Sequence, residues 1–228
     1  MTATITTLFD DARPQAPASQ PHGNLLPAPP GWPAPPGPAA YHGLLGEIVR
    51  RLEPETESDP VAILAQLLVG FGAAVGRGAY FQVEATRHHP QEFVLLVGET
   101  ATARKGTSWD HARALIGTAD QTLVSRILTG LASGEGLVWA VRDPNGSDPG
   151  VSDRRLLAFE SEFASALKAA SRDNSTLSAT LRSAWDGRPL ALLTRTAPAR
   201  ASDAAIAVVG HITAVELRHH LTALELAN

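Results

Sequence analysis

The chain has 228 residues, of which 44% are hydrophobic and 18% are charged, with a formal net charge of −4 at pH 7 and no cysteine. This composition supports a substantial hydrophobic core and excludes disulfides and zinc sites built on thiolates. An overall negative charge does not favour a polyanion partner, so binding to nucleic acid would require a local basic patch.

The first 40 residues contain ten of the seventeen prolines. The stretch "PAPPGWPAPPGPAA" lacks regular backbone donors and favours polyproline II, so we expect residues 1–40 to be a disordered tail or linker. A ligand for a proline-binding domain is the alternative. The start, "MTATITTLFDDARPQ", has an acidic pair and no apolar run, unlike a signal peptide. Together with the absence of cysteine, it predicts a cytoplasmic protein.

Residues 41–90 are expected to form a helical segment with one strand. The apolar residues of "YHGLLGEIVRRLEP" have helical spacing as far as Pro54. Asp59 followed by Pro60 is a typical start for a second helix, "VAILAQLLVGFGAAVGRG". Its apolar stretch is interrupted by Gln66 and glycines, so we expect a buried helix and no membrane span. "AYFQVEA" alternates and predicts a strand.

Residues 91–228 have the pattern of an α/β core. "EFVLLVG" is a continuous apolar run, as expected for a strand buried on both faces. Further strands are predicted in "SRILTGLASGEG", "RRLLAFE", "PLALLTRT" and "AAIAVVGHIT". Helices are predicted in "SWDHARALIGTA", "SEFASALKAASRD", "STLSATLRSAWDG" and "AVELRHHLTALELAN". Helices that separate apolar strands predict a mostly parallel sheet with flanking helices.

The stretch "VLLVGETATARKGTSW" (94–109) combines a strand, a loop of small residues, and a lysine with hydroxyls. A phosphate-binding loop needs backbone N–H groups at a helix N-terminus, a lysine for the β- and γ-phosphates, and a hydroxyl for Mg²⁺. Lys105 and Thr107 can fill these roles. The spacing is one residue longer than usual, and Arg104 replaces the expected second glycine. An ordinary turn between strand and helix is the alternative. The predicted loop contacts with a nucleotide are Gly98, Thr100, Arg104, Lys105, Gly106, Thr107 and Ser108.

Three glutamates are candidate catalytic acids. Glu160 and Glu162 follow the strand "RRLLAFE", where an acid can hold Mg²⁺ or orient an attacking water. An acidic first helical turn is the alternative. Glu135 lies between two glycines in "LASGEGL" and is a candidate to polarise water, with a plain turn as the alternative. The predicted metal ligands are Thr107 and Glu160.

The strand "VVGHIT" ends in His211 and Thr213, which are candidates to sense a γ-phosphate. A histidine at the edge of the core, hydrogen-bonded to backbone, is the alternative. The other histidines have no carboxylates at ligand spacing, so we expect no metal cage beyond the Mg²⁺ of a nucleotide.

Five strings, in order over residues 40–228, resemble a family of uncharacterised P-loop proteins: "GETATARKGTSW", "LASGEGLVWAVRDP", "LLAFESEFA", "TLSATLRSAWDGRPL" and "GHITAVELRHHL". This family occurs in actinobacteria, their phages and mobile elements, often beside primase–polymerase modules. The resemblance implies a RecA-like, helicase-like ATPase core that binds ATP and Mg²⁺. It also implies a role in DNA replication, with single-stranded DNA and primase or replication proteins as partners, and a homo-oligomer when full length.

Members of the family continue beyond the equivalent of "LELAN", so the resemblance also implies a core truncated at its C-terminus. Three alternatives to a working ATPase remain. The chain could be a nucleotide-binding module without turnover, a truncated inactive remnant, or a small-molecule kinase, for which an arginine-rich lid is missing from the sequence.

Overall fold

The computed structural model describes residues 34–99, 104–192 and 198–221. Most of the expected disordered tail, residues 1–33, and the loop residue Thr100 lie outside the described residues. Pro36–Asn228 belong to one compact unit. The helical segment 41–90 therefore lies in the same unit as the predicted core.

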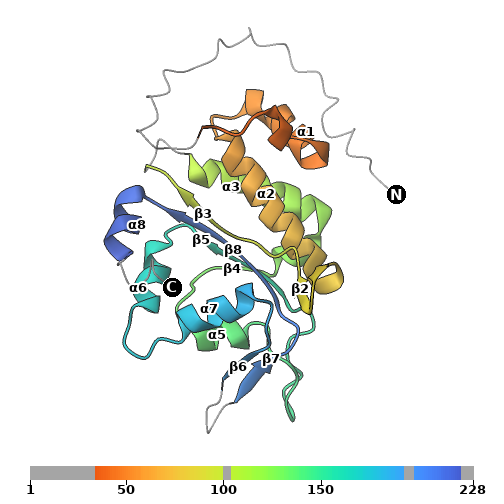
Figure 1. Cartoon of the computed structure of the whole chain (residues 1–228), viewed down its shortest axis with the longest axis vertical. Helices are drawn as coiled ribbons and strands as arrows, with labels where there is room; N and C mark the ends of the chain where they lie inside the picture. Colours follow the sequence, from red (N-terminus) through yellow and green to blue (C-terminus); the bar gives the residue numbers. More distant parts are fainter. Residues whose placement is uncertain (1–33, 100–103, 193–197, 222–228) are drawn as a thin grey trace. The chain divides into compact units, whose positions relative to one another are not determined.

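The centre of the fold is a four-stranded sheet in which every pairing is parallel (Figure 1). Its strand order is β3 (Phe93–Val97), β8 (Ala205–Ile212), β5 (Arg155–Glu160) and β4 (Ile127–Leu128). The prediction of an α/β fold with a parallel sheet flanked by helices is confirmed. All residues of β8 are buried, because this apolar strand has neighbours on both sides and helices over both faces.

One face of the sheet is covered by four helices: α1 (Gly43–Leu52), α2 (Pro60–Val75), α3 (Lys105–Ala119) and α4 (Gln121–Val124). Ile63 of α2 and Trp109 of α3 are buried there in one cluster with Val209 of β8. The predicted start of α2 is confirmed, since the Asp59 carboxylate accepts a hydrogen bond from the backbone N–H of Val61 at 2.7 Å.

The opposite face is covered by a second set of elements: α5 (Gly134–Trp139), α6 (Ala164–Ala170), α7 (Leu177–Trp185), α8 (Ala214–His220) and an antiparallel pair formed by β6 (Leu190–Leu192) and β7 (Ala199–Ala201). Phe163, just before α6, is buried with Ile212 of β8, and Leu217 of α8 packs against the same cluster. The helices after β3 and after β8 therefore lie on opposite faces of the sheet.

A few short elements complete the described chain: 3₁₀ turns at Pro38–Ala40, Glu53–Glu55 and Gly76–Gly78, and a hairpin formed by β1 (Phe81–Val83) and β2 (Thr86–His88). The helical segment Pro60–Gly78 is long and apolar enough to cross a membrane. Helices in the core of soluble proteins often have the same length and composition. Here α2 packs against α3 and β8, in line with the expected buried helix.

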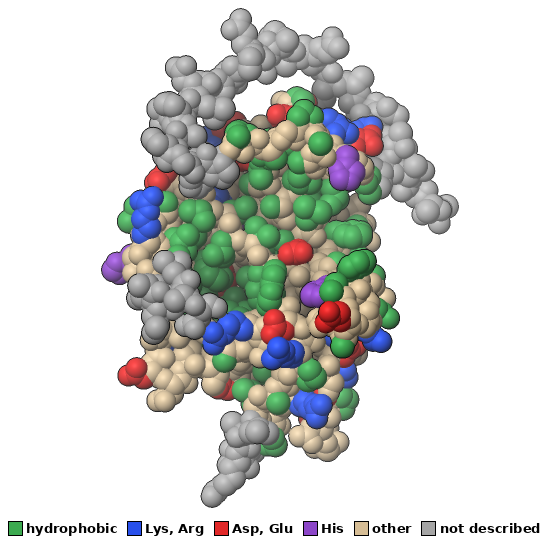
Figure 2. All heavy atoms as spheres, viewed as in Figure 1, with side chains coloured by type: hydrophobic (Ala, Val, Ile, Leu, Met, Phe, Trp, Pro, Cys, Tyr) green, Lys and Arg blue, Asp and Glu red, His purple; other side chains and the backbone are tan. Residues whose placement is uncertain are grey.

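The prediction for β3 needs a correction. Its apolar run suggested burial on both faces, but β3 is the edge strand of the described sheet, and Leu95 and Val97 are each 38% exposed. Hydrophobic side chains gather on the face where α2 and β3 lie (Figure 2). The strand that is buried throughout is β8, whose sequence contains a glycine and a histidine and is less uniformly apolar.

Candidate functional site

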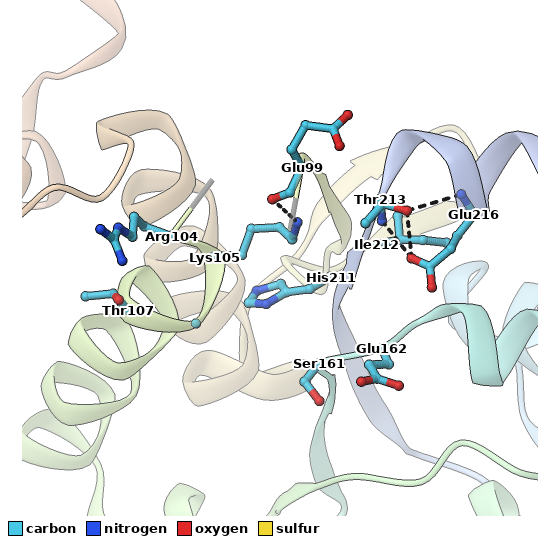
Figure 3. Close-up of a pocket in the computed structure, with 11 residues that line it drawn as sticks. Glu99, Arg104, Lys105, Thr107, Ser161, Glu162, His211, Ile212, Thr213 and Glu216 are labelled. Carbon is cyan, nitrogen blue, oxygen red and sulfur yellow. Dashed lines mark hydrogen bonds between the residues drawn. The ribbon is translucent and has the colours of Figure 1, made fainter. Parts of the chain in front are cut away.

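The chain leaves neighbouring strands β3 and β8 in opposite directions. It passes from β3 to α3 on one face of the sheet and from β8 to α8 on the other. In open parallel sheets, such a reversal opens a crevice beyond the carboxyl ends of the strands, where ligands bind. A cavity of about 460 Å³ lies at this place (Figure 3), a size typical of small-molecule sites. Its lining residues are Glu99, Arg104, Lys105, Gly106, Thr107, Ser161, Glu162, His211, Ile212, Thr213 and Glu216.

Lys105 is the first residue of α3, and its side chain reaches back over the mouth of the crevice. Its Nζ donates hydrogen bonds to the backbone carbonyls of Gly98 and Glu99. Partial burial lowers the pKa of Lys105, while the carboxylates of Glu99 and Glu216 act in the opposite direction. The lysine therefore lines the cavity at the first turn of α3.

Arg104 stands where the predicted loop pattern has its second glycine. Its backbone adopts φ 45° and ψ 29°, the left-handed conformation that glycine takes without strain. The glycine-like geometry is thus present although the residue is arginine. The guanidinium forms an ion pair with Glu57 at 2.7 Å, and both side chains are largely exposed.

Among the described residues, the N-cap residue of α3, Arg104, makes no side-chain hydrogen bond to the first turn. The same holds for α1, α6 and α7, whereas Asp59 caps α2 and Thr213 caps α8. The first N–H groups of a helix need acceptors, and an anion supplies them well because the helix dipole is positive at this end. Gly106, in this first turn, has open space where a Cβ would be, so a ligand can approach the backbone closely.

Two neighbouring hydroxyl residues of the predicted loop point to different places. Thr107 is exposed and lines the cavity. Ser108 is fully buried, donates to the backbone carbonyl of Lys105 at 2.8 Å and accepts from Gln66 Nε2 at 2.8 Å. The predicted contact of Ser108 with a nucleotide is therefore not supported by its position.

The two strand-end acids diverge. Glu160 is 8% exposed, and its Oε1 accepts a hydrogen bond from the backbone N–H of Leu131 at 2.6 Å, outside the cavity. Glu162 follows in the turn between β5 and α6 and lines the cavity. The prediction of Glu160 as a metal ligand or catalytic acid is not supported, because its carboxylate is directed to the β4–α5 connection. Of these two acids, only Glu162 lines the crevice.

Glu135 is not in the crevice either. It lies in the first turn of α5, where Thr176 Oγ1 donates to its carboxylate at 2.9 Å. A backbone hydrogen bond at the start of the helix, and then that of Thr176, lower the pKa of Glu135. Gly134 beside it is required by packing, since a Cβ there would lie 2.4 Å from Thr180 Oγ1. The flanking glycine reflects close helix packing, and the predicted catalytic role of Glu135 is not supported.

His211 lies at the centre of the lining residues in Figure 3, between α3 and the segment that carries Ser161 and Glu162. It is 3% exposed, and burial followed by the charge of Lys105 lowers its pKa to about 4. Its Nε2 is 3.0 Å from Gln66 Oε1, so a glutamine side chain satisfies this nitrogen in place of the backbone group considered from the sequence.

Thr213, the second member of the predicted sensor pair, has a structural role. Its Oγ1 donates to Glu216 Oε2 at 2.8 Å and accepts from the backbone N–H of Glu216 at 3.2 Å. This reciprocal capping box begins α8. Thr213 lines the cavity, but its hydroxyl is committed to the helix.

Gln66 was not among the predicted site residues, because in the sequence it only interrupts an apolar helix. A single polar residue at a fully buried helical position was the available signal, since buried polar groups need partners. Ser161, Glu99 and Glu216 were also missed, because their positions on the lining depend on how three strand ends meet.

In residues 34–99, 104–192 and 198–221, no group of three or more His, Asp or Glu side chains is placed to hold a metal ion. Mg²⁺ bound with a nucleotide does not need such a cage, since it is held by one or two carboxylates together with phosphate oxygens and water. Glu162 fits this requirement. Figure 3 shows Thr107 and Glu162 on different sides of His211.

The fold and the crevice define an α/β protein with a parallel sheet and a lysine-bearing helix N-terminus at the carboxyl ends of its strands. Comparisons with protein-family models, curated proteins and solved structures find no match to this chain.

Proposed function

We propose that the chain binds ATP together with Mg²⁺ in the crevice between β3 and β8, as a P-loop protein with a RecA-like core. The observation that supports this best is the position of Lys105 at the N-terminus of α3, beside the point where the chain reverses direction across the sheet. A helix N-terminus, a lysine and an exposed hydroxyl suit a chain of phosphates.

The charges of the lining favour a metal-bound phosphate over a free one. The cavity has two cationic side chains, Arg104 and Lys105, and three carboxylates, Glu99, Glu162 and Glu216, so its lining has one more negative charge than positive. A polyphosphate alone would meet this excess of negative charge, whereas Mg²⁺ compensates it. We therefore expect nucleotide binding to depend on Mg²⁺.

We further propose that the chain hydrolyses ATP and acts as a helicase-like protein in DNA replication of a phage or mobile element. Glu162 and His211 are two of the polar groups that line the crevice where we place the phosphates. The role in replication, with single-stranded DNA and primase or replication proteins as partners, is supported by the sequence resemblance alone. The test is ATP binding and turnover measured with and without single-stranded DNA. Absence of ATP binding would overturn the proposal.

The second candidate is a nucleotide-binding module without turnover. The positions of Glu135 and Glu160 favour it, since both carboxylates are hydrogen-bonded outside the crevice. It predicts Mg²⁺-dependent ATP binding with no release of phosphate, and turnover above background would exclude it.

Replacing Gly106 by alanine is expected to separate stability from binding. Alanine is more favourable than glycine in a helix by up to about 1 kcal/mol. Apart from the chain neighbours and the backbone of α3 itself, no atom of the described residues lies within 4 Å of the added Cβ. The thermal midpoint should be unchanged or higher. A Cβ at the first turn of α3 should nevertheless keep phosphate from the backbone and weaken ATP binding roughly tenfold or more. Calorimetric titration and thermal unfolding measure both effects, and undiminished affinity would place the phosphates elsewhere.

Glutamine substitutions at the two strand-end acids should affect different properties, turnover in one variant and stability in the other. Glu162→Gln is expected to reduce Mg²⁺-dependent turnover about 10- to 100-fold and change stability by less than about 0.5 kcal/mol, because the side chain is exposed at the crevice. Glu160→Gln should cost about 1 kcal/mol, because the charge-assisted bond from Leu131 weakens, and leave turnover unchanged. Steady-state ATPase assays and thermal melts of both variants check this. Loss of turnover in Glu160→Gln but not in Glu162→Gln would instead indicate that Glu160 is the metal ligand.

A further inference from the structure

Three buried polar side chains join α2, α3 and β8 beneath the crevice. Gln66 and Ser108 are fully buried and His211 is 3% exposed. They form a continuous series of hydrogen bonds, from His211 Nε2 to Gln66 Oε1 at 3.0 Å, from Gln66 Nε2 to Ser108 Oγ at 2.8 Å, and from Ser108 Oγ to the backbone carbonyl of Lys105 at 2.8 Å. The series therefore runs from the floor of the crevice to the first turn of α3.

The direction of every hydrogen bond in this series follows from two backbone carbonyl groups, which can only accept. The carbonyl of Lys105 can only accept, so the Ser108 hydroxyl donates its one hydrogen there and must accept from Gln66. Gln66 Nε2 also lies 2.9 Å from the carbonyl of Ala62, a second group that can only accept. Both observations place the amide nitrogen toward these acceptors and the amide oxygen toward His211. The oxygen accepts only from a donor, so His211 must have its hydrogen on Nε2.

We infer that Gln66 is a positioning residue that holds His211 as the neutral Nε2–H tautomer, so that His211 Nδ1 offers the crevice a hydrogen-bond acceptor. Among the described residues, Nδ1 has no hydrogen-bond partner of its own. The group that meets His211 in the crevice is therefore a donor, such as a water molecule or a ligand hydroxyl, and not a bare phosphate oxygen. This revises the expectation of a γ-phosphate sensor. The part that concerns a nucleotide rests on the proposed function.

The surroundings keep the imidazole neutral. Its ring is packed edge-on against Phe159, with 5.1 Å between ring centroids. Burial, and then the positive charge of Lys105, lower the pKa of His211 to about 4. The carboxylates of Glu162, after β5, and Glu216, on α8, line the same cavity. At neutral pH the hydrogen bond with Gln66 thus decides which ring nitrogen is protonated.

The first test needs no substitution. Imidazole ¹⁵N shifts of the full chain, with His211 assigned by the resonance missing from His211→Asn, report the protonation of each ring nitrogen. We expect a protonated Nε2 and an unprotonated Nδ1 from about pH 5 to pH 8. An ordinary histidine, with a pKa of about 6.5, would gain a second proton within this range. A protonated Nδ1 at pH 7, in either the other tautomer or the imidazolium, would overturn the inference.

Two substitutions of Gln66 test whether its side chain determines the tautomer of His211. Gln66→Leu removes the acceptor, and the Nδ1–H form should rise to a substantial fraction. Gln66→Glu adds a carboxylate beside Nε2, which should raise the pKa of His211. The matched control is Gln82→Leu, on the exposed hairpin, with no change at His211. An unchanged tautomer in folded Gln66→Leu would refute the positioning role. If that variant does not fold, the wild-type spectrum and Gln66→Glu still decide.

Adding Mg²⁺ and ATP to the wild-type sample tests ATP binding separately from the positioning of His211 by Gln66. A complex in which Nδ1 remains unprotonated supports the acceptor role, and protonation of Nδ1 on binding contradicts it. No spectral change anywhere in the chain would refute ATP binding, while the tautomer measured without ATP still tests the role of Gln66.

Discussion

Lys105→Ala is expected to reduce the affinity for Mg²⁺–ATP by about 100-fold, because a hydrogen bond to a charged group contributes up to about 3 kcal/mol and each factor of ten corresponds to about 1.4 kcal/mol. Lys105 lines the crevice, and its Nζ donates hydrogen bonds to the carbonyls of Gly98 and Glu99 at the mouth of the crevice. The fold should survive, because the amine is only partly buried and, among the described residues, bonds only the carbonyls of Gly98 and Glu99. Calorimetric titration with Mg²⁺–ATP measures the loss, and circular dichroism confirms the fold.

The chain offers a matched control, since its two lysines are Lys105 and Lys168. Lys168 is exposed on α6 and does not line the crevice. Lys168→Ala removes the same charge from the surface and should leave affinity within about twofold, the scale of an exposed charge. Equal losses in both variants would indicate a general electrostatic effect. Full affinity in Lys105→Ala would remove the phosphate-binding role from this helix N-terminus.

The sequence was sufficient to predict the order of elements around the crevice. Lys105 and Thr107 were predicted from a strand, a loop of small residues and a lysine, which form a local pattern along the chain, and both line the cavity. The substitution of Arg104 for glycine looked like a defect, yet its backbone adopts the left-handed conformation that the pattern requires. A backbone conformation imposed by the surrounding fold is not visible in residue types alone.

The directions of side chains at the strand ends were not predictable. Glu160 and Glu162 are two residues apart and equally acidic, and only the turn after β5 decides that Glu162 faces the cavity. Gln66 is separated from His211 by 145 positions, so their hydrogen bond depends on how α2 crosses the sheet. The same reason explains the error at β3, since whether an apolar strand is central or at an edge depends on the pairing of all the strands.

At the other end of the sheet, Arg155→Met is expected to destabilise the fold by about 2–3 kcal/mol, which corresponds to a fall in the thermal midpoint of roughly 4–12 °C. Arg155 begins β5, and its guanidinium forms ion pairs with Asp153 and Asp120 and donates to the carbonyl of Ala74. Its side chain is 22% exposed, so solvent screens the pairs only in part and the estimate lies below that for a fully buried pair.

The destabilisation should depend on pH with a defined sign. The side-chain hydrogen bonds of Thr122 and then Arg155 lower the pKa of Asp120 from 3.8 to about 2, and the hydrogen bond of Arg155 also lowers the pKa of Asp153. A carboxylate whose pKa is lowered by folding stabilises the fold above its ordinary pKa, and this contribution is lost as the pH falls through the folded value. The difference between wild type and Arg155→Met should therefore be largest above about pH 4 and shrink toward pH 2.

Denaturant unfolding of both proteins at pH 7, 4 and 2.5 measures this difference. Arg188→Met is the control, because the Arg188 side chain is 73% exposed and pairs with Asp186 at 3.3 Å, so its loss should cost less than about 0.5 kcal/mol at any pH. A constant difference between wild type and Arg155→Met across this range would attribute the loss to packing of the arginine side chain. Since Arg155 and the crevice lie at opposite ends of β5, the affinity for Mg²⁺–ATP of the folded variant should be unchanged, which separates what holds the sheet together from what binds the ligand.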